Sequence, residues 1–282
     1  VDPASTSSSS GATTSSSSGG PLDAGPISDS STDAPVDAGS DGGDPSTFDP
    51  KSIPNLTLWL DANKGAGATG TVTNWVDQIT LIAAHGDGIY GLDASTEKCV
   101  PPARIAGEIK GKDVIRFNGS SNCIVMDSEF FDRFRDFQPG FTAFLVTKPG
   151  PALGTDEAIL DFSPDGQESG DYAYIARIDG RPKYSMANPM TGVETASTAS
   201  TTFLEGEAHA LTVSAKPGDA GAFTSNSVRL FLDGTLLTTS SQPVVHVPRV
   251  LNRNKSTIGR FVPGNGSPTV LAPGWYRGDV AE

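Results

Sequence analysis

The sequence has few metal-binding residues and no segment suited to crossing a membrane. Its three histidines, His85, His209 and His246, are widely separated, and its two cysteines do not form a C-x-x-C pair. This spacing does not match a zinc site. No apolar run approaches the roughly 18 to 20 residues of a membrane helix, so we expect no transmembrane segment in this chain.

Positive charge is missing from the first 50 residues, which contain no Lys, Arg or Glu but have 14 Ser and eight Asp. Such a segment cannot bury enough apolar area to offset its chain entropy. We therefore predict a disordered Ser/Gly/Asp-rich linker over residues 1–52 and one folded domain over residues 53–282. A chain that starts in such a linker is typical of a processed, secreted protein.

The overall charge of the chain is negative, which argues against partners that need a basic protein surface. The formal net charge is -13, and residues 51–282 still carry 25 acidic against 20 basic side chains. Binding to nucleic acids or to anionic membranes needs a basic face. We therefore expect no nucleic-acid partner.

Cys99 and Cys123 are the two cysteines, and they flank the strand-like run 113–118. In an oxidising compartment they could bridge neighbouring strands. We predict a disulfide between them, with two buried free thiols as the alternative.

From residue 51 onward, short apolar runs are separated by Gly, Pro, Asn and Asp, a pattern typical of an all-β sandwich or barrel. Asp233-Gly234 between two apolar runs is the strongest hairpin signal, because this pair suits a type I′ turn. Several runs carry large side chains on both faces, which predicts strands covered on both sides. His209 lies in an apolar strand and is interpreted as a hydrogen-bonded core residue. Strands are expected at 56–60, 113–118, 140–147, 158–162, 171–177, 208–214, 228–232 and 235–238, and one short helix at 128–137.

Gly65, Gly67 and Gly70 match the G-x-G-x-x-G spacing of dinucleotide-binding loops. That site needs a strand directly before the loop and a helix directly after it. Here the β-branched and aromatic run 71–76 follows, which favours a strand. We interpret the glycines as a loop between strands that contain Trp59 and Trp75, both predicted to lie in the core.

An ordered set of segments resembles the laminin-G-like branch of the concanavalin A-like lectin/glucanase superfamily. The resemblance covers residues 56–282 and implies a two-sheet antiparallel jelly-roll sandwich. Such modules in bacterial envelope proteins commonly follow a Ser/Gly-rich tether, so the resemblance implies a secreted or cell-surface protein held by its N-terminal linker. The segments are 58–62, 72–77, 115–120, 141–146, 228–234, 257–260 and 276–282.

Two features depart from the family pattern. After Asp77, the usual Ser-Gly-Asn-Gly turn is replaced by Gln78-Ile79-Thr80-Leu81. The chain also stops at Glu282, inside what the resemblance identifies as the closing strand. We therefore expect a truncated last strand and an exposed sheet edge.

The catalytic signature of related glucanases is absent. Jelly-roll glucanases of this superfamily carry Glu-x-Asp-x-Glu on one strand, which points the carboxylates into one groove. The nearest acidic runs here, Asp156-Glu157 with Asp161 and Asp279 with Glu282, have mixed parity and would not share a face. We therefore predict no catalytic residues and a non-catalytic binding module, with a polysaccharide hydrolase or lyase as the second alternative.

A sugar site needs aromatic faces and planar polar groups. Tyr172 and Tyr174 share one strand face because side chains alternate with a period of two. A packed sheet face with tyrosine hydroxyls at its rim is the alternative interpretation. The richest cluster that combines both kinds of group consists of Asp171, Tyr172, Tyr174, Arg177, Arg181 and Tyr184.

No cofactor is required by these patterns, but some laminin-G-like domains bind Ca²⁺ at loop aspartates. On that resemblance the candidate ligands are Asp77, Asp87 and Asp161. The partner predicted from all these features is a glycan. An envelope or extracellular protein, bound by a sandwich without a sugar site, is the alternative.

Overall fold

The computed structural model describes residues 49–68, 70–81, 83–85, 99–126, 140–154, 156–162, 172–188, 193–216, 228–239, 256–261 and 274–282. The chain divides into two units, Val1–Phe48 and Asp49–Glu282. The first unit, which holds most of the predicted linker, and the predicted helix at 128–137 lie outside the described residues. Among the described residues, no helix has the length and apolar character needed to span a membrane.

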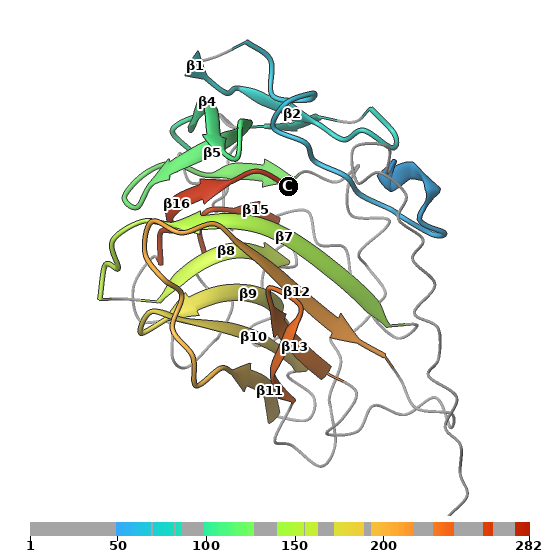
Figure 1. Cartoon of the computed structure of the whole chain (residues 1–282), viewed down its shortest axis with the longest axis vertical. Coiled ribbons are helices and arrows are strands. Elements are labelled where there is room, and N and C mark those ends of the chain that lie inside the picture. Colours follow the sequence, from blue (N-terminus) through green and yellow to red (C-terminus); the bar gives the residue numbers. More distant parts are fainter. Residues whose placement is uncertain are drawn as a thin grey trace, which may run out of the picture. The chain divides into compact units, whose positions relative to one another are not determined.

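The described part is all-β, as predicted, and consists of two antiparallel sheets (Figure 1). The first sheet has the strand order β1-β4-β5-β16-β7-β12-β13-β14, and the second has the order β11-β10-β9-β8-β15-β6-β3-β2. A 3₁₀ turn at Pro50–Ser52 precedes them. The strands are β1 (Gly70–Thr71), β2 (Asn74–Val76), β3 (Ala83–His85), β4 (Ala103–Ile109), β5 (Lys112–Asn118), β6 (Ile124–Met126), β7 (Phe141–Pro149), β8 (Glu157–Phe162), β9 (Tyr172–Ile178), β10 (Arg181–Asn188), β11 (Val193–Thr198), β12 (His209–Ala215), β13 (Val228–Leu232), β14 (Thr235–Thr239), β15 (Ser256–Ile258) and β16 (Arg277–Val280).

The main core lies between the two sheets. Strand β13 shows why: Val228, Leu230 and Leu232 are buried, while the residues between them are more exposed. A period of two places all three apolar side chains on the face toward the other sheet. Each fully buried aliphatic side chain stabilises the fold by roughly 1.5 to 3 kcal/mol. Both tryptophans predicted to be core, Trp59 and Trp75, are buried.

The turn between β13 and β14 has the predicted type I′ geometry. Asp233 has φ 51° and Gly234 has φ 78°. Positive φ at both central residues matches the right-handed twist of the two strands, and Asp-Gly tolerates it at low cost.

The strand predicted at 56–60 is wrong except for one bridge, Leu60 to Asp77. The backbone N–H of Trp59 donates to Asp77 Oδ1 at 2.9 Å instead of joining a ladder. In the glycine run that follows, Gly65 and Gly67 lie in a loop, as predicted, while Gly70 begins β1. A side chain of the first sheet holds this loop. Arg104 donates to the carbonyl oxygens of Gly67 and Asn63.

The exposed edge expected at the last strand does not occur at β16. This strand lies inside the first sheet, with β5 on one side and β7 on the other (Figure 1). Val280 faces Ile115 in β5 and Thr147 in β7. Both rows of backbone groups on β16 are therefore paired.

The predicted disulfide is present between Cys99 and Cys123, whose Cα atoms are 5.0 Å apart. Beside it, Val100 and Asn122 form a bridge. The Asn122 amide donates to the carbonyl oxygens of Val100 and Pro101 at 3.1 Å. The disulfide and this amide together attach the segment before β4 to the start of β6.

Candidate functional site

The structure divides the predicted sugar cluster between two faces of the second sheet. Tyr172 and Tyr174 share one face of β9, and their rings stack with centroids 5.4 Å apart and planes 19° apart. Tyr184 points into the main core, and Arg177 lies on the opposite face of β9 from the tyrosines, since it is an odd number of residues away. Arg181 is exposed at the start of β10. Asp171 lies outside the described residues.

The tyrosine face is covered. Tyr172 and Tyr174 are each 2% exposed. Phe261 meets the Tyr174 ring edge-on at 4.8 Å, and Lys183 Nζ lies 5.6 Å from the centre of that ring. This is the arrangement of a packed sheet face, which was the alternative interpretation of the tyrosine pattern.

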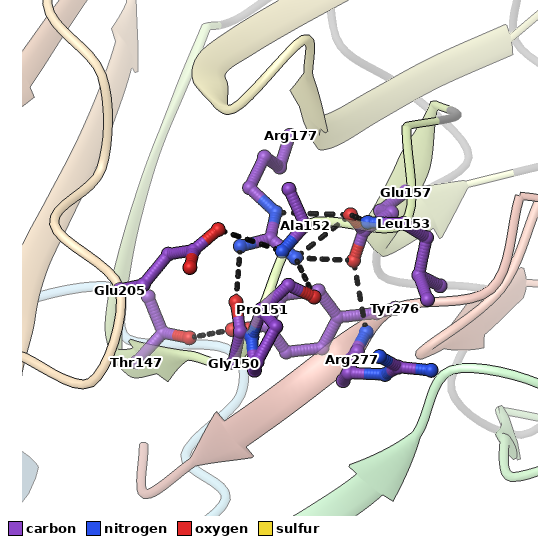
Figure 2. Close-up of polar contacts among 10 residues, drawn as sticks. All are labelled: Thr147, Gly150, Pro151, Ala152, Leu153, Glu157, Arg177, Glu205, Tyr276 and Arg277. Atoms are coloured by element: carbon purple, nitrogen blue, oxygen red, sulfur yellow. Dashed lines mark hydrogen bonds and ion pairs between the residues drawn. The ribbon is translucent and has the colours of Figure 1, made fainter.

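Arg177 forms a buried ion pair with Glu157 (Figure 2). Its guanidinium donates to Glu157 Oε1 and Oε2 at 2.7 and 2.6 Å, and to the carbonyl oxygen of Gly150 at 2.7 Å. Glu157 also accepts from the backbone N–H groups of Leu153 and Arg277. These contacts join β8 and β9 of the second sheet to residues at the ends of β7 and β16 in the first. Arg177 therefore links the two sheets, and it does not lie beside the tyrosine face.

A buried hydroxyl chain lies next to this ion pair (Figure 2). Thr147 Oγ1 donates to the carbonyl oxygen of Asp279 at 2.8 Å, so the Tyr276 hydroxyl donates to Thr147 Oγ1 at 2.5 Å. Burial raises the pKa of Tyr276 above its ordinary range. The phenol therefore remains a neutral hydrogen-bond donor, which suits a structural role.

Two of the three calcium candidates, Asp77 and Asp161, fall within the described residues. Asp77 is fully buried, and its carboxylate accepts from the N–H groups of Trp59, Ile79 and Thr80. Asp161 lies in β8 opposite Tyr174, and Asp87 falls outside the described residues. Within the described ranges, no group of three His, Cys, Asp or Glu side chains is placed to hold a metal ion.

Glu157 and Asp161 have the same parity, but a bulge between Ala158 and Leu160 shifts the register of β8 and separates them. Glu157 pairs with Arg177 in the ladder, whereas Asp161 pairs with Tyr174, so the two carboxylates lie on opposite faces of β8. In the first sheet, Asp279 binds Arg116 through two hydrogen bonds of 2.7 and 2.8 Å.

His209 is a hydrogen-bonded, buried residue, as predicted. Its Nε2 accepts from the backbone N–H of Leu204, so the proton lies on Nδ1, which contacts Asp233 Oδ2 at 2.8 Å. Burial raises the pKa of Asp233, but the hydrogen bonds from His209 and from the backbone N–H of Ala210 outweigh it, and the net pKa is lowered. The contact holds the start of β12 against the β13–β14 turn.

Sequence reasoning missed an exposed apolar row on the outer face of the first sheet. Phe144 in β7, Thr212 in β12, Phe231 in β13 and Leu236 in β14 are successive ladder partners, so they form one line across four strands. Phe144 is 63% exposed and Leu236 is 50% exposed, while Thr212 and Phe231 are partly buried. We call these four residues the Phe144 row. The prediction that strands with large side chains on both faces are covered on both sides is thus wrong for β7.

A polar row runs beside the Phe144 row, two residues along each strand. It consists of Thr142, Ser214 and Arg229, which are again ladder partners. The Thr142 hydroxyl donates to Ser214 Oγ at 3.4 Å. The only signal for this surface in the sequence is the alternation itself, which placed Thr142 and Phe144 on the face away from the core residues of β7.

No family model matches the sequence, and no curated protein matches it. Solved structures do show similarity of fold. A CBM40 module of the Ruminococcus gnavus IT-sialidase, bound to α2,3 sialyllactose, aligns with 60% of this chain and 86% of its own length, at 11% identity and a TM-score of 0.46.

Two further matches are parts of larger proteins. Trypanosoma rangeli sialidase in complex with the inhibitor DANA aligns with 79% of this chain and 29% of its own length, at 14% identity and a TM-score of 0.48. Domains LG4-5 of the mouse laminin α1 chain align over 69% of this chain and 44% of theirs, at 12% identity and a TM-score of 0.40. At these levels the similarity concerns the fold alone.

Proposed function

We propose that this chain is a non-catalytic carbohydrate-binding module that uses the Phe144 row as its contact surface. The observation that carries the proposal is the exposure of Phe144 beside the polar row. An aromatic ring offers an apolar face to the C–H surface of a sugar, and nearby hydroxyls and a guanidinium offer partners for sugar hydroxyls.

Exposing the Phe144 ring to water has a free-energy cost. A large ring on a central strand loses apolar burial when it faces water, and exposed apolar patches rimmed by polar groups mark interaction sites. Phe144 stands on β7, which has paired neighbours on both sides in the first sheet. The ladder therefore fixes the backbone under the ring, and little ordering is lost when a ligand binds.

The predicted location forms part of the same proposal. A disulfide between Cys99 and Cys123 persists in oxidising compartments, which supports a secreted or surface-exposed protein. The Ser/Gly/Asp-rich residues 1–52 would then act as the tether.

The alternative is that the Phe144 row binds an envelope or extracellular protein. Leu236 favours it, because an exposed leucine contributes apolar area but no planar ring. Removing the Phe144 ring would weaken either complex, so the variant alone does not separate the two functions. The nature of the bound molecule does.

The test is a glycan array and an envelope-extract pull-down with the full chain, each with and without Ca²⁺. We expect glycan binding that Phe144→Ala weakens by about tenfold and that Leu204→Ala leaves unchanged. Leu204 is the matched control, since it is 53% exposed and stands outside the row. No glycan binding, together with a protein captured by the wild type and lost with Phe144→Ala, would replace this proposal with the alternative. Product release from any bound glycan would contradict the non-catalytic assignment.

A further inference from the structure

The spacing within the Phe144 row points to one class of sugar. Phe144 and Phe231 are separated by one intervening strand, β12, because both pair with Thr212. Neighbouring strands lie 4.7 to 4.9 Å apart, so the backbones that carry the two rings are about 9.5 Å apart across the sheet. This is close to one disaccharide repeat of an extended β-1,4-linked chain.

We infer that the row binds an extended, neutral β-1,4-linked polysaccharide that lies across the strands. This inference rests on the proposed function and adds the class of ligand. In such a chain, every second sugar presents the same face in the same orientation. Phe144 and Phe231 would contact two such sugars, and the sugar between them would lie over Thr212.

The polar row fits the same direction. It lies about 7 Å from the Phe144 row, since two residues along a strand rise by that distance. A chain that follows one row therefore runs parallel to the other for its whole length. Hydroxyls of Thr142 and Ser214 and the guanidinium of Arg229 then lie along one side of the sugars, where hydroxyl groups project.

Charge selects a neutral glycan over an anionic one. The two rows hold no carboxylate and one cationic side chain, Arg229. Residues 51–282 carry 25 acidic against 20 basic side chains, so a polyanionic glycan approaches the domain against a net negative charge. A neutral polymer avoids this repulsion and matches the uncharged Phe144 row.

The Phe144 row also favours internal segments of a polysaccharide over the ends of the polysaccharide chain. A site for a terminal sugar needs walls that enclose it, whereas the four residues of the Phe144 row lie in one line on a sheet face. Affinity should therefore depend on the number of sugars. An oligosaccharide that reaches one ring gains one aromatic contact, and one that reaches both gains two.

The experiment is calorimetric titration of the full chain with β-1,4-linked gluco-oligosaccharides of two to six units. We expect affinity to rise by about tenfold or more between the disaccharide and the tetrasaccharide and then to level off. Phe144→Ala and Phe231→Ala should each remove this gain, while Leu204→Ala should retain it. Thermal melts establish that each variant is folded, and Leu236→Ala provides a second, more exposed position if Phe231→Ala does not fold.

Three other probes complete the test. An α-1,4-linked hexasaccharide, whose chain curves, and the two sialyllactoses, which carry a negative charge, should bind at least about tenfold more weakly than the β-1,4-linked hexasaccharide. Equal affinity for di- and hexasaccharide, or stronger binding of either other probe through Phe144, would overturn the β-1,4 inference and leave the carbohydrate-binding proposal standing. Absence of binding to every sugar would overturn both.

Discussion

Arg177 and Glu157 lie 20 positions apart in the sequence, yet their charged groups meet at 2.6 Å with 1% of either side chain exposed. The pair stands where the two sheets join, and it also binds the backbone of Gly150 and Arg277. Taking two charges out of water is costly, and here seven hydrogen bonds and the mutual attraction offset that cost.

Removing one partner of this pair should destabilise the domain strongly. Glu157→Ala leaves a buried guanidinium without its counter-ion, which costs about 3 to 5 kcal/mol of unfolding free energy. Urea unfolding of the wild type and the variant measures the difference. Lys64→Ala is the control, because 55% of the Lys64 side chain is exposed, and its ion pair with Asp61 should contribute less than about 1 kcal/mol.

A double variant separates the pair from the rest of its surroundings. Arg177→Met with Glu157→Leu removes both charges together, so its loss should be smaller than the sum of the two single losses. Additive losses would show that the two charges are not coupled.

Acid should weaken the contact between His209 and Asp233. The folded-state pKa of Asp233 is lowered from its ordinary 3.8. A carboxylate with a lowered pKa stabilises the fold above the unfolded value, and that stabilisation is lost as the pH falls through the folded-state pKa. Half of the Asp233 side chain is exposed, so we expect an effect below about 1 kcal/mol.

Asp233→Asn is the variant to compare, since Asn tolerates the positive φ of this turn residue. The stability difference between wild type and variant should shrink as the pH falls below about 4. Chemical unfolding at a series of pH values measures it. A difference that grows on acidification would contradict the lowered pKa.

Leu81 should be replaceable with a gain in stability. It has φ 65° and is 72% exposed, and its backbone N–H donates to the carbonyl oxygen of Asp77 in the turn after β2. The left-handed conformation costs a leucine roughly 1 to 2 kcal/mol, and Asn adopts it more easily. We expect Leu81→Asn to add about 1 kcal/mol and to raise the melting temperature by about 2 to 4 °C.

Leu204→Asn is the matched control, because Leu204 is also exposed but does not have a positive φ. It should leave the melting temperature unchanged. If Leu81→Asn and Leu204→Asn behaved alike, the backbone of Leu81 would not be strained.

The strands and turns were accessible to sequence reasoning because their causes are local. Asp233-Gly234 sets its own turn, and the period-two pattern of 228–232 sets which side chains are buried. The strand predicted at 56–60 was wrong because the partner of its backbone is distant in the sequence. Its backbone at Trp59 bonds to the Asp77 side chain, and propensity does not report a partner 18 positions away.

The candidate site was harder to predict from the sequence, because each strand contributes only one residue to each row. Tyr172 and Tyr174 are conspicuous in the sequence since they stand together, but they are covered in the fold. Phe144 and Phe231 are 87 positions apart and become neighbours in one row only through β12.

By itself, the sequence determined the all-β class, the period-two burial of most strands, the type I′ turn and the cysteine pair, because local geometry and side-chain alternation decide these features. Only the tertiary structure decided which strand faces are covered, since that depends on how the two sheets and their connections pack. The same packing placed β16 between β5 and β7, buried Arg177 against Glu157, and left Phe144 on an open sheet face.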